Sequence, residues 1–235
     1  MAWFTRGWSF RPGEHAPHAW GRLGGFVDGV YAIAATLLVI ELRPPADPAG
    51  HLGEELRHMW PEYLAYAIGF TQMIAGWLQT RRLDAWMRGI DHYATLLVLF
   101  SVGIYALTPF STAVLATAIG NRTDLSTAVQ LSAALLFVAL VAFAGLLLYA
   151  RSAGLLRGDV QPDALILYMR MAVFIVPLVP VLVFVVAAVA PWAGLALLIG
   201  LNLLGLLPLE SHQPPAGVER GPRPASSRSP RRVRR

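Results

Sequence analysis

Residues 21–42, GRLGGFVDGVYAIAATLLVIEL, decide the fold, because a short charged entry is followed there by a long apolar run. Arg22 and Asp28 stand six residues apart at the entry. The run from residue 29 to residue 40 carries no charge, and its hydroxyl groups belong to Tyr31 and Thr36. An aspartate at the start of a helix of membrane length is costly and requires a structural or functional reason.

The composition of the whole chain places this stretch in a membrane. Of its 235 residues, 56% are hydrophobic and only 14% are charged, whereas soluble domains carry about 25% charged residues. Several separate apolar stretches reach the roughly 20 residues that a helix needs to cross a bilayer. The sequence therefore predicts an all-α, polytopic membrane protein. Cysteine is absent, which excludes disulfides, thiolate catalysis and cysteine metal sites.

Six transmembrane helices are expected, at residues 26–42, 60–80, 93–119, 126–150, 165–190 and 191–209. The first is closed by Arg43-Pro44-Pro45, because proline cannot continue a helix, and Pro177 and Pro180 should kink the fifth. Residues 1–20 are then a cytoplasmic N-terminal segment, residues 21–209 a six-helix membrane domain, and residues 210–235 a disordered, arginine-rich cytoplasmic tail.

The arginines predict the orientation of these spans. They gather in the N-terminal segment, in the turns after the second and fourth spans, and in the tail, whereas the opposite loops hold only Arg43, Arg57 and Arg122. Because arginine-rich loops stay in the cytoplasm, both termini are expected there. The net charge of +5 is matched by the tail alone, so we expect no nucleic-acid partner for the folded part.

One face of the first span has an unusual pattern. Gly29, Ile33, Thr36 and Ile40 form a stripe about 60° wide on a helical wheel, with Leu37 beside it. The stripe could be a seam between helices, where Thr36 bonds within its own helix or to a neighbour. The other interpretation is a pore wall in a symmetric oligomer, with apolar constrictions on either side of a ring of hydroxyls.

The charged entry also has two interpretations. Arg22 could be a cytoplasmic anchor and Asp28 an N-cap of the first span. Alternatively, Asp28 at the edge of the hydrocarbon has a partner, for which Arg22 is the nearest candidate in sequence. An enzyme is not expected, because the chain has no phosphate-binding glycine loop, no Ser-His-Asp arrangement and no histidines at metal-ligand spacing.

Residues 22–42 resemble the first helix of the transmembrane protein 175 family. The family signature is an arginine, three variable residues, Phe-Ser-Asp and an apolar run with a threonine. Pro109-Phe110-Ser111-Thr112 also resembles a segment of this family. Six spans with cytoplasmic termini agree with the family over roughly residues 20–209, and the tail lies outside it.

The resemblance implies a potassium-permeable cation channel in the bacterial inner membrane. Its subunits would assemble as a homotetramer in membrane lipid, with the first helix of each lining a central pore. Ile33 would be the narrowest apolar seal, Thr36 the hydroxyl layer linked to potassium selectivity, and Ile40 the next apolar layer, flanked by Leu37. Potassium and other monovalent cations would permeate without any cofactor. The signature residues that would hold the helices in register are Arg22, Phe26 and Asp28.

Three positions depart from the family pattern. The signature serine is replaced by Val27, and an asparagine usual in the third span falls at Val98. A histidine pair is usual after Trp77, where this chain has Leu-Gln-Thr-Arg. These changes remove polar partners from the network around Asp28, whereas the stripe itself is intact.

Two other functions remain open from the residues. A secondary transporter, proton-coupled or otherwise, would require a carboxylate or histidine near the midplane and a pair of broken helices, and neither is evident. A non-conducting membrane scaffold would act through the arginine-rich tail, which could bind anionic lipid or a partner.

Overall fold

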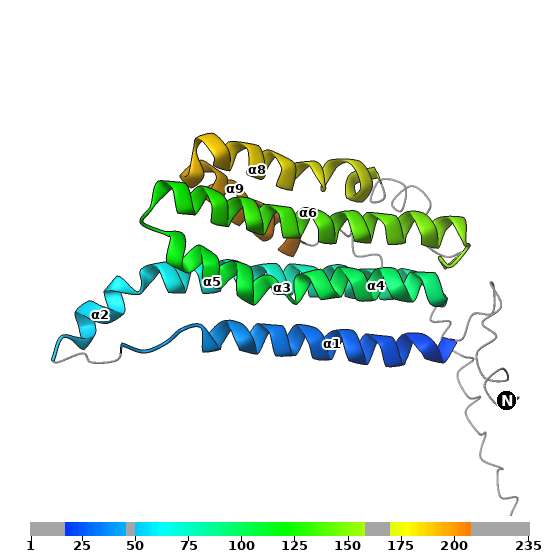
Figure 1. Ribbon diagram of the computed structural model, residues 1–235. Helices are drawn as coiled ribbons and strands as arrows, with labels where there is room; N and C mark the ends of the chain where they lie inside the picture. The colour runs from blue at the N-terminus through cyan, green and yellow to red at the C-terminus, as the bar shows by residue number, and fades with distance from the viewer. Residues whose placement is uncertain (1–16, 46–49, 158–169, 208–235) are drawn as a thin grey trace, which may run out of the picture.

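The computed structural model describes residues 17–45, 50–157 and 170–207 (Figure 1). Within these ranges the regular structure is helical, and the β-type pairing is a single bridge between Met87 and Leu156. The all-α fold is thereby confirmed. Most of the expected N-terminal segment, the first residues of the expected fifth span and the expected tail lie outside the described residues.

Helix α1 spans Pro17–Ile40 and is 24 residues long. It ends before Arg43-Pro44-Pro45, as the prolines require, but it begins well before the expected start at residue 26. Asp28 therefore lies more than two turns inside the helix, where backbone amides are already bonded to earlier carbonyls. The interpretation of Asp28 as an N-cap is wrong.

The expected second span is helix α3, Trp60–Trp86, and it is preceded by a short helix, α2, Leu52–His58. None of the helices expected from the sequence includes α2. Its first turn holds two glutamates and its last turn an arginine and a histidine, so its charges complement the helix dipole. Arg81 and Arg82, which were expected in a turn, lie on α3 because this helix continues to Trp86.

The expected third span is broken into α4, His92–Tyr105, and α5, Thr108–Ala118. Pro109 lies in the first turn of α5 and has no N–H, so it cannot donate to the carbonyl of Tyr105. Helix α6, Arg122–Ser152, follows, and Asn121 caps it by accepting from the amides of Thr123 and Asp124.

The last two expected spans are also represented among the described residues. A π-helical turn, η1, Met171–Ile175, leads into α8, Leu178–Val189, and Pro177 lies at the junction. The expected fifth span is interrupted at Pro177, whereas Pro180, the other residue expected to kink it, lies in the first turn of α8 and does not end that helix. Helix α9, Pro191–Leu206, completes the described chain.

Helix α6 lies at the centre of the bundle, against α4, α5, α8 and α9, and its buried face is rich in alanine and leucine. Helix α1 lies at one border of the molecule, with α8 at the other border, and it packs on α3, α4 and α5 (Figure 1). Within the described ranges, three stretches are long and apolar enough to cross a membrane, namely Gly21–Ile40, His92–Ala118 and Arg122–Ser152. With two shorter apolar helices beside them, they make this a membrane protein.

Candidate functional site

Helix α1 packs on the bundle through one narrow face. Val27, Tyr31, Ala34 and Leu38 are all at most 5% exposed and recur every three or four residues, which is the spacing of one side of an α-helix. These four residues are called the packed face of α1. They attach the helix to α3, α4 and α5 and thereby set its rotation.

The packed face approaches α3 closely at a glycine. An added Cβ on Gly69 would lie 2.9 Å from Leu38 Cδ2 and 2.7 Å from Thr112 Cγ2. Both distances are shorter than a normal carbon–carbon contact of about 3.5–4.0 Å. Gly69 therefore permits α1, α3 and α5 to meet without a gap, and this contact holds the second half of α1 in place.

The opposite side of α1 is exposed. Ile33 and Ile40 are 63% and 65% exposed, and Leu37 is 44% exposed. An added Cβ on Gly29 would have no atom within 4 Å. The stripe identified in the sequence is therefore on the exposed side of α1, and none of the described helices packs on it as a seam. We call Ile33, Thr36, Leu37 and Ile40 the exposed face.

Thr36 lies between the two isoleucines on the exposed face. Its hydroxyl donates a hydrogen bond of 2.7 Å to the carbonyl oxygen of Ile33, three residues earlier in the same helix. This bond uses the single donor of the side chain and leaves the oxygen lone pairs free to accept. Thr36 can therefore present an oxygen ligand toward a cation or water outside the helix.

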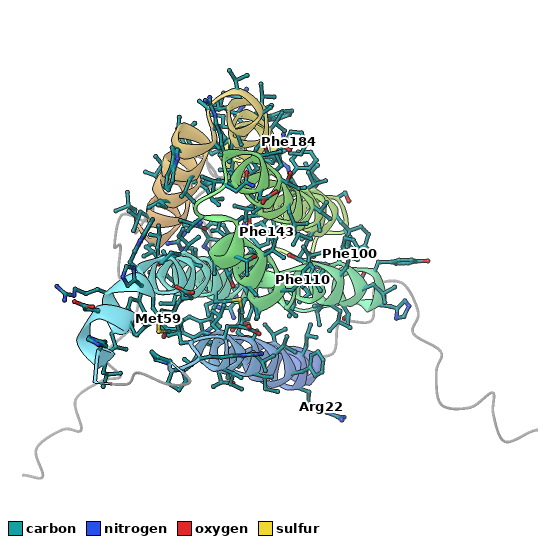
Figure 2. All side chains as sticks on the ribbon, turned by 60° about the vertical axis from the view of Figure 1, so that its left-hand side comes forward. Arg22, Met59, Phe100, Phe110, Phe143 and Phe184 are labelled. Carbon is teal, nitrogen blue, oxygen red and sulfur yellow. The ribbon has the colours of Figure 1, made fainter. Side chains whose placement is uncertain are left out.

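Asp28 has a partner, but it is not Arg22. Its Oδ1 accepts a hydrogen bond of 2.8 Å from Nε1 of Trp77 on α3. Arg22 is exposed and points away from the other helices (Figure 2). The guanidinium of Arg81 lies 5.4 Å from the centre of the Trp77 ring, within cation–π range. The cost of the aspartate is thus offset by a bond to the indole of α3.

A second polar layer lies next to this bond. The rings of Tyr31 and Tyr105 lie 5.8 Å apart, and the Tyr105 hydroxyl donates to Oε1 of Gln79 at 3.3 Å. An added Cβ on Gly76 would lie 2.8 Å from the Tyr105 ring, so the ring rests directly on the backbone of α3. Thr80 donates to the Gly76 carbonyl at 3.0 Å.

The structure shows what surrounds the three positions that depart from the family pattern. Val27 and Val98 are both 2% exposed and belong to the apolar core. The sequence after Trp77 supplies Gln79 and Thr80 to the tyrosine layer described above. The remaining signature residue, Phe26, is 58% exposed, so it does not pack in the core of its own subunit.

Sequence reasoning missed the partners of Asp28 and of Tyr105. Both Trp77 and Gln79 entered the sequence analysis only where the chain departs from the family pattern after Trp77. These contacts join residues 49 and 26 positions apart. Trp77 is half-buried in an apolar span, where its N–H requires an acceptor, and this requirement was the available signal.

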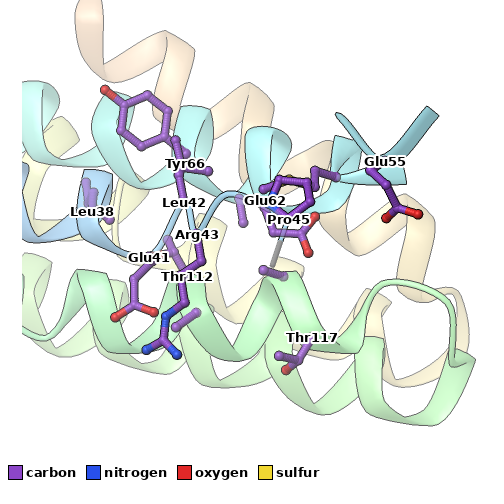
Figure 3. A pocket seen from close by; sticks show the side chains of 14 residues that line it. Leu38, Glu41, Leu42, Arg43, Pro45, Glu55, Glu62, Tyr66, Thr112 and Thr117 are labelled. Carbon is purple, nitrogen blue, oxygen red and sulfur yellow. The ribbon is translucent and has the colours of Figure 1, made fainter. Parts of the chain in front are cut away.

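A cavity of about 370 Å³ lies near the C-terminal end of α1, between α1, α3 and α5 (Figure 3). Its lining includes the carboxylates of Glu41, Glu55 and Glu62 and the side chain of Arg43. Oε2 of Glu62 is buried and has no hydrogen-bond partner among the described residues. Within those residues, no group of three His, Cys, Asp or Glu side chains is arranged to hold a metal ion.

Comparison with known proteins bears on the same part of the chain. Residues 22–109 match the sequence model of the family described as "Endosomal/lysosomal potassium channel TMEM175". A curated potassium channel of Streptomyces collinus is 35% identical over 97 residues, which are 41% of this chain and 47% of that protein. A curated potassium channel of Chamaesiphon minutus is 37% identical over 103 residues, 41% of this chain and 49% of that protein.

The chain thus aligns with about half the length of the curated relatives it matches. The fold is similar over a longer stretch. A crystal structure of a lysosomal potassium-selective channel TMEM175 homolog from Chamaesiphon minutus has a TM-score of 0.71 to this chain at 22% identity. The likeness covers 80% of this chain and 96% of that one, and at this identity it establishes the fold.

Proposed function

Since the chain belongs to the TMEM175 family through its residues 22–109, we propose that it forms a potassium-permeable cation channel. Conduction is passive, through a central pore lined by α1 from each subunit of a homotetramer. The matched relatives are named potassium channels, and the matched family is one of channels rather than enzymes.

The observation that carries the proposal is the exposed face of α1. An apolar helix face that is uncovered within its own subunit is covered by lipid, by another subunit, or by the water and ions of a pore. Thr36 sits on this face with its donor occupied and its oxygen available, between exposed Ile33 and Ile40. Two apolar layers with a hydroxyl layer between them are suited to a pore that closes by dewetting.

In this arrangement Ile33 and Ile40, with Leu37 beside them, form the apolar constrictions, and Thr36 forms the layer that selects potassium. The packed face and the Asp28–Trp77 bond support this pore by holding α1 at one rotation. Arg22 and Phe26, both exposed, then contribute to register between subunits rather than within one.

The proposed topology has six spans in the bacterial inner membrane, with residues 1–20 and 210–235 cytoplasmic and residues 21–209 as the membrane domain. The described charges support it. Among the described residues, the end of the bundle where α1 begins carries seven arginines and three aspartates, and these are Arg22, Arg81, Arg82, Arg88, Arg151, Arg157, Arg170, Asp28, Asp84 and Asp91. The opposite end carries three arginines and five acids, which are Arg43, Arg57, Arg122, Glu41, Glu54, Glu55, Glu62 and Asp124. This asymmetry satisfies the positive-inside rule.

Potassium flux from proteoliposomes tests the function. Purified protein in potassium-loaded vesicles should release potassium down its gradient, without saturation and without a requirement for a proton gradient. Vesicles without protein provide the baseline. Strict coupling to protons would instead favour a transporter, and the absence of flux under every gradient would contradict the proposal.

A further inference from the structure

A short helix projects from the end of the bundle where α1 ends. Helix α2, Leu52–His58, leaves the line of α3 (Figure 1), and none of its residues is buried. The helix is interrupted there because Pro61 has no N–H and cannot donate to the carbonyl of Arg57. Isolated helices shorter than about 12 residues are only marginally stable in water. Helix α2, with seven residues, therefore requires a partner along its length.

The apolar residues of α2 and of the first turn of α3 share one side. Helical bonds continue on both sides of Met59, since its amide donates to the carbonyl of Glu55 and its carbonyl accepts from the amide of Tyr63, each at 3.2 Å. At 100° per residue, four apolar side chains fall within an arc of about 80°. They are each between 40% and 49% exposed, and they are Leu52, Leu56, Trp60 and Tyr63. We call these four residues the α2 face.

The charged side chains of α2 lie away from this face and contact their own segment. Nε of Arg57 donates to the carbonyl of Gly53 at 3.1 Å, and Nδ1 of His51 lies 3.9 Å from Oε2 of Glu54. The two glutamates, the arginine and the histidine of α2 leave it with little net charge. The partner of α2 is therefore bound through the apolar side chains of the α2 face rather than through charge.

The α2 face lies near the level where α1 leaves the apolar part of the membrane. The close approach of Gly69 to Leu38 places the antiparallel helices α1 and α3 level at that contact. At 1.5 Å per residue, Tyr63 and Trp60 lie roughly 5 and 9 Å beyond Glu41, the first charged residue after the apolar run of α1. Tryptophan and tyrosine are enriched at the level of lipid head groups. The position of the α2 face therefore matches the membrane–water boundary.

The α2 face also points away from the bundle. The buried residues of α3 lie on the other side of that helix, at Ala65, Ile68 and Gln72 among others. In the direction of the membrane, the α2 face continues with Ala67 and Phe70, which are both exposed. The outward side of a helix bundle in a membrane is apolar because it meets acyl chains. This continuity indicates lipid as the occupant of the α2 face.

We propose that α2 is an interfacial anchor, whose apolar face lies at the boundary between head groups and acyl chains in the leaflet nearest the end of α1. Amphipathic helices with a tryptophan on the apolar side lie about 5–10 Å deep in this boundary. The bilayer supplies the contact that keeps so short a helix folded. Because the charge on α2 is nearly balanced, zwitterionic lipid is sufficient. The anchor acts whether or not the protein conducts ions.

The test locates α2 in full-length protein, separately from flux, and uses the absence of cysteine from the chain. Leu56→Cys on the α2 face and the matched control Glu54→Cys on the charged side are each labelled with the fluorophore NBD, in phosphatidylcholine nanodiscs. The label at residue 56 should emit at the shorter wavelength. Lipids with a nitroxide near the head group should quench it at least about twofold more than the label at residue 54, because the apolar side enters the boundary.

Iodide in the water should instead quench the label at residue 54 more strongly. Replacing part of the phosphatidylcholine with phosphatidylglycerol should leave both signals unchanged, since charge does not hold the anchor in place. If the Leu56→Cys protein does not fold, Leu52→Cys replaces it with the same expected results.

Four results would overturn the proposal. Equal quenching by iodide at both positions would place the α2 face in water. Protection of the label at residue 56 from both iodide and lipid nitroxides would show that a second copy of the chain covers the face. Stronger quenching by a nitroxide near the end of the acyl chain would place α2 within the hydrocarbon. A requirement for phosphatidylglycerol would make the contact electrostatic.

Discussion

The two faces of α1 are both apolar, yet one is buried in the bundle and the other is exposed. Val27, Tyr31, Ala34 and Leu38 are buried against the bundle, whereas Ile33 and Ile40, one turn or less away, are more than 60% exposed. Hydropathy cannot separate these faces. What separates them is the partner: Gly69 lets α3 reach the packed face, and no described helix reaches the other.

The difference in burial indicates that the two faces of this one apolar helix have different roles. The packed face is expected to control stability, and the exposed face is expected to control conduction. Substitutions on the two faces should therefore have effects of different kinds, even when the chemical change is the same.

The largest expected effect comes from placing asparagine on each face. Leu38→Asn should destabilise the protein by about 3 kcal/mol or more, because it leaves a cavity and buries an amide. Ile33→Asn should leave the unfolding midpoint close to that of the unmodified chain. It should raise potassium leak about tenfold or more, because the asparagine amides that surround the pore would keep the constriction hydrated. Thermal unfolding in detergent and vesicle flux measure the two effects. Equal loss of stability in both variants would contradict the division.

The Asp28–Trp77 bond is the next test, since it fixes the rotation that separates the faces. A double-mutant cycle with Asp28→Ala and Trp77→Phe should give a coupling energy of about 1.5–3 kcal/mol, the range for a hydrogen bond to a charged group. A parallel cycle with Asp28→Ala and Arg22→Gln should give a coupling near zero. Strong coupling in the Arg22 cycle would restore the ion pair expected from the sequence.

A pair of glycines tests the packing at finer scale. Gly69→Ala should cost about 1–3 kcal/mol, because its Cβ would collide with Leu38 and Thr112. Gly29→Ala, with open space around it, should stabilise the helix by up to about 1 kcal/mol. Unfolding midpoints of the two variants check this. A stabilising Gly69→Ala would show that α1 and α3 do not meet as described.

The smallest effect on stability is expected at Thr36. Thr36→Val and Thr36→Ser should both change stability by less than about 0.5 kcal/mol, as exposed substitutions usually do. They should differ in function, because only serine keeps the oxygen ligand. The ratio of potassium to sodium flux should fall in Thr36→Val and persist in Thr36→Ser. The same ratio in both variants would remove Thr36 from selection.

Much of the fold was predictable because its causes are local. Apolar runs of membrane length mark helices, and Arg43-Pro44-Pro45, Pro177 and Pro191 mark where helices end, bend or begin. The break before Pro109 was missed because the apolar run continues through it. Helix α2 was missed because it is short and exposed, with no buried residue to reveal it.

The stripe on α1 was predictable as a pattern, since helical geometry alone aligns Ile33, Thr36 and Ile40. Which side of α1 would be covered was not predictable, because that depends on Gly69 and Trp77 in another helix. Asp28 shows the same limit. Its cost was evident from the sequence, but nearness in sequence suggested Arg22, while the bundle supplies an indole 49 residues away.

The most direct test of the central claim uses the absence of cysteine from the chain. A single cysteine is introduced as Thr36→Cys on the exposed face or Leu38→Cys on the packed face, and each protein is treated with a charged methanethiosulfonate during flux. We predict that modification of the Thr36→Cys protein abolishes potassium flux, while the buried Leu38→Cys protein is neither labelled nor blocked. Full labelling of the Thr36→Cys protein, verified by its mass, with unchanged flux would contradict the account and place the exposed face outside the pore.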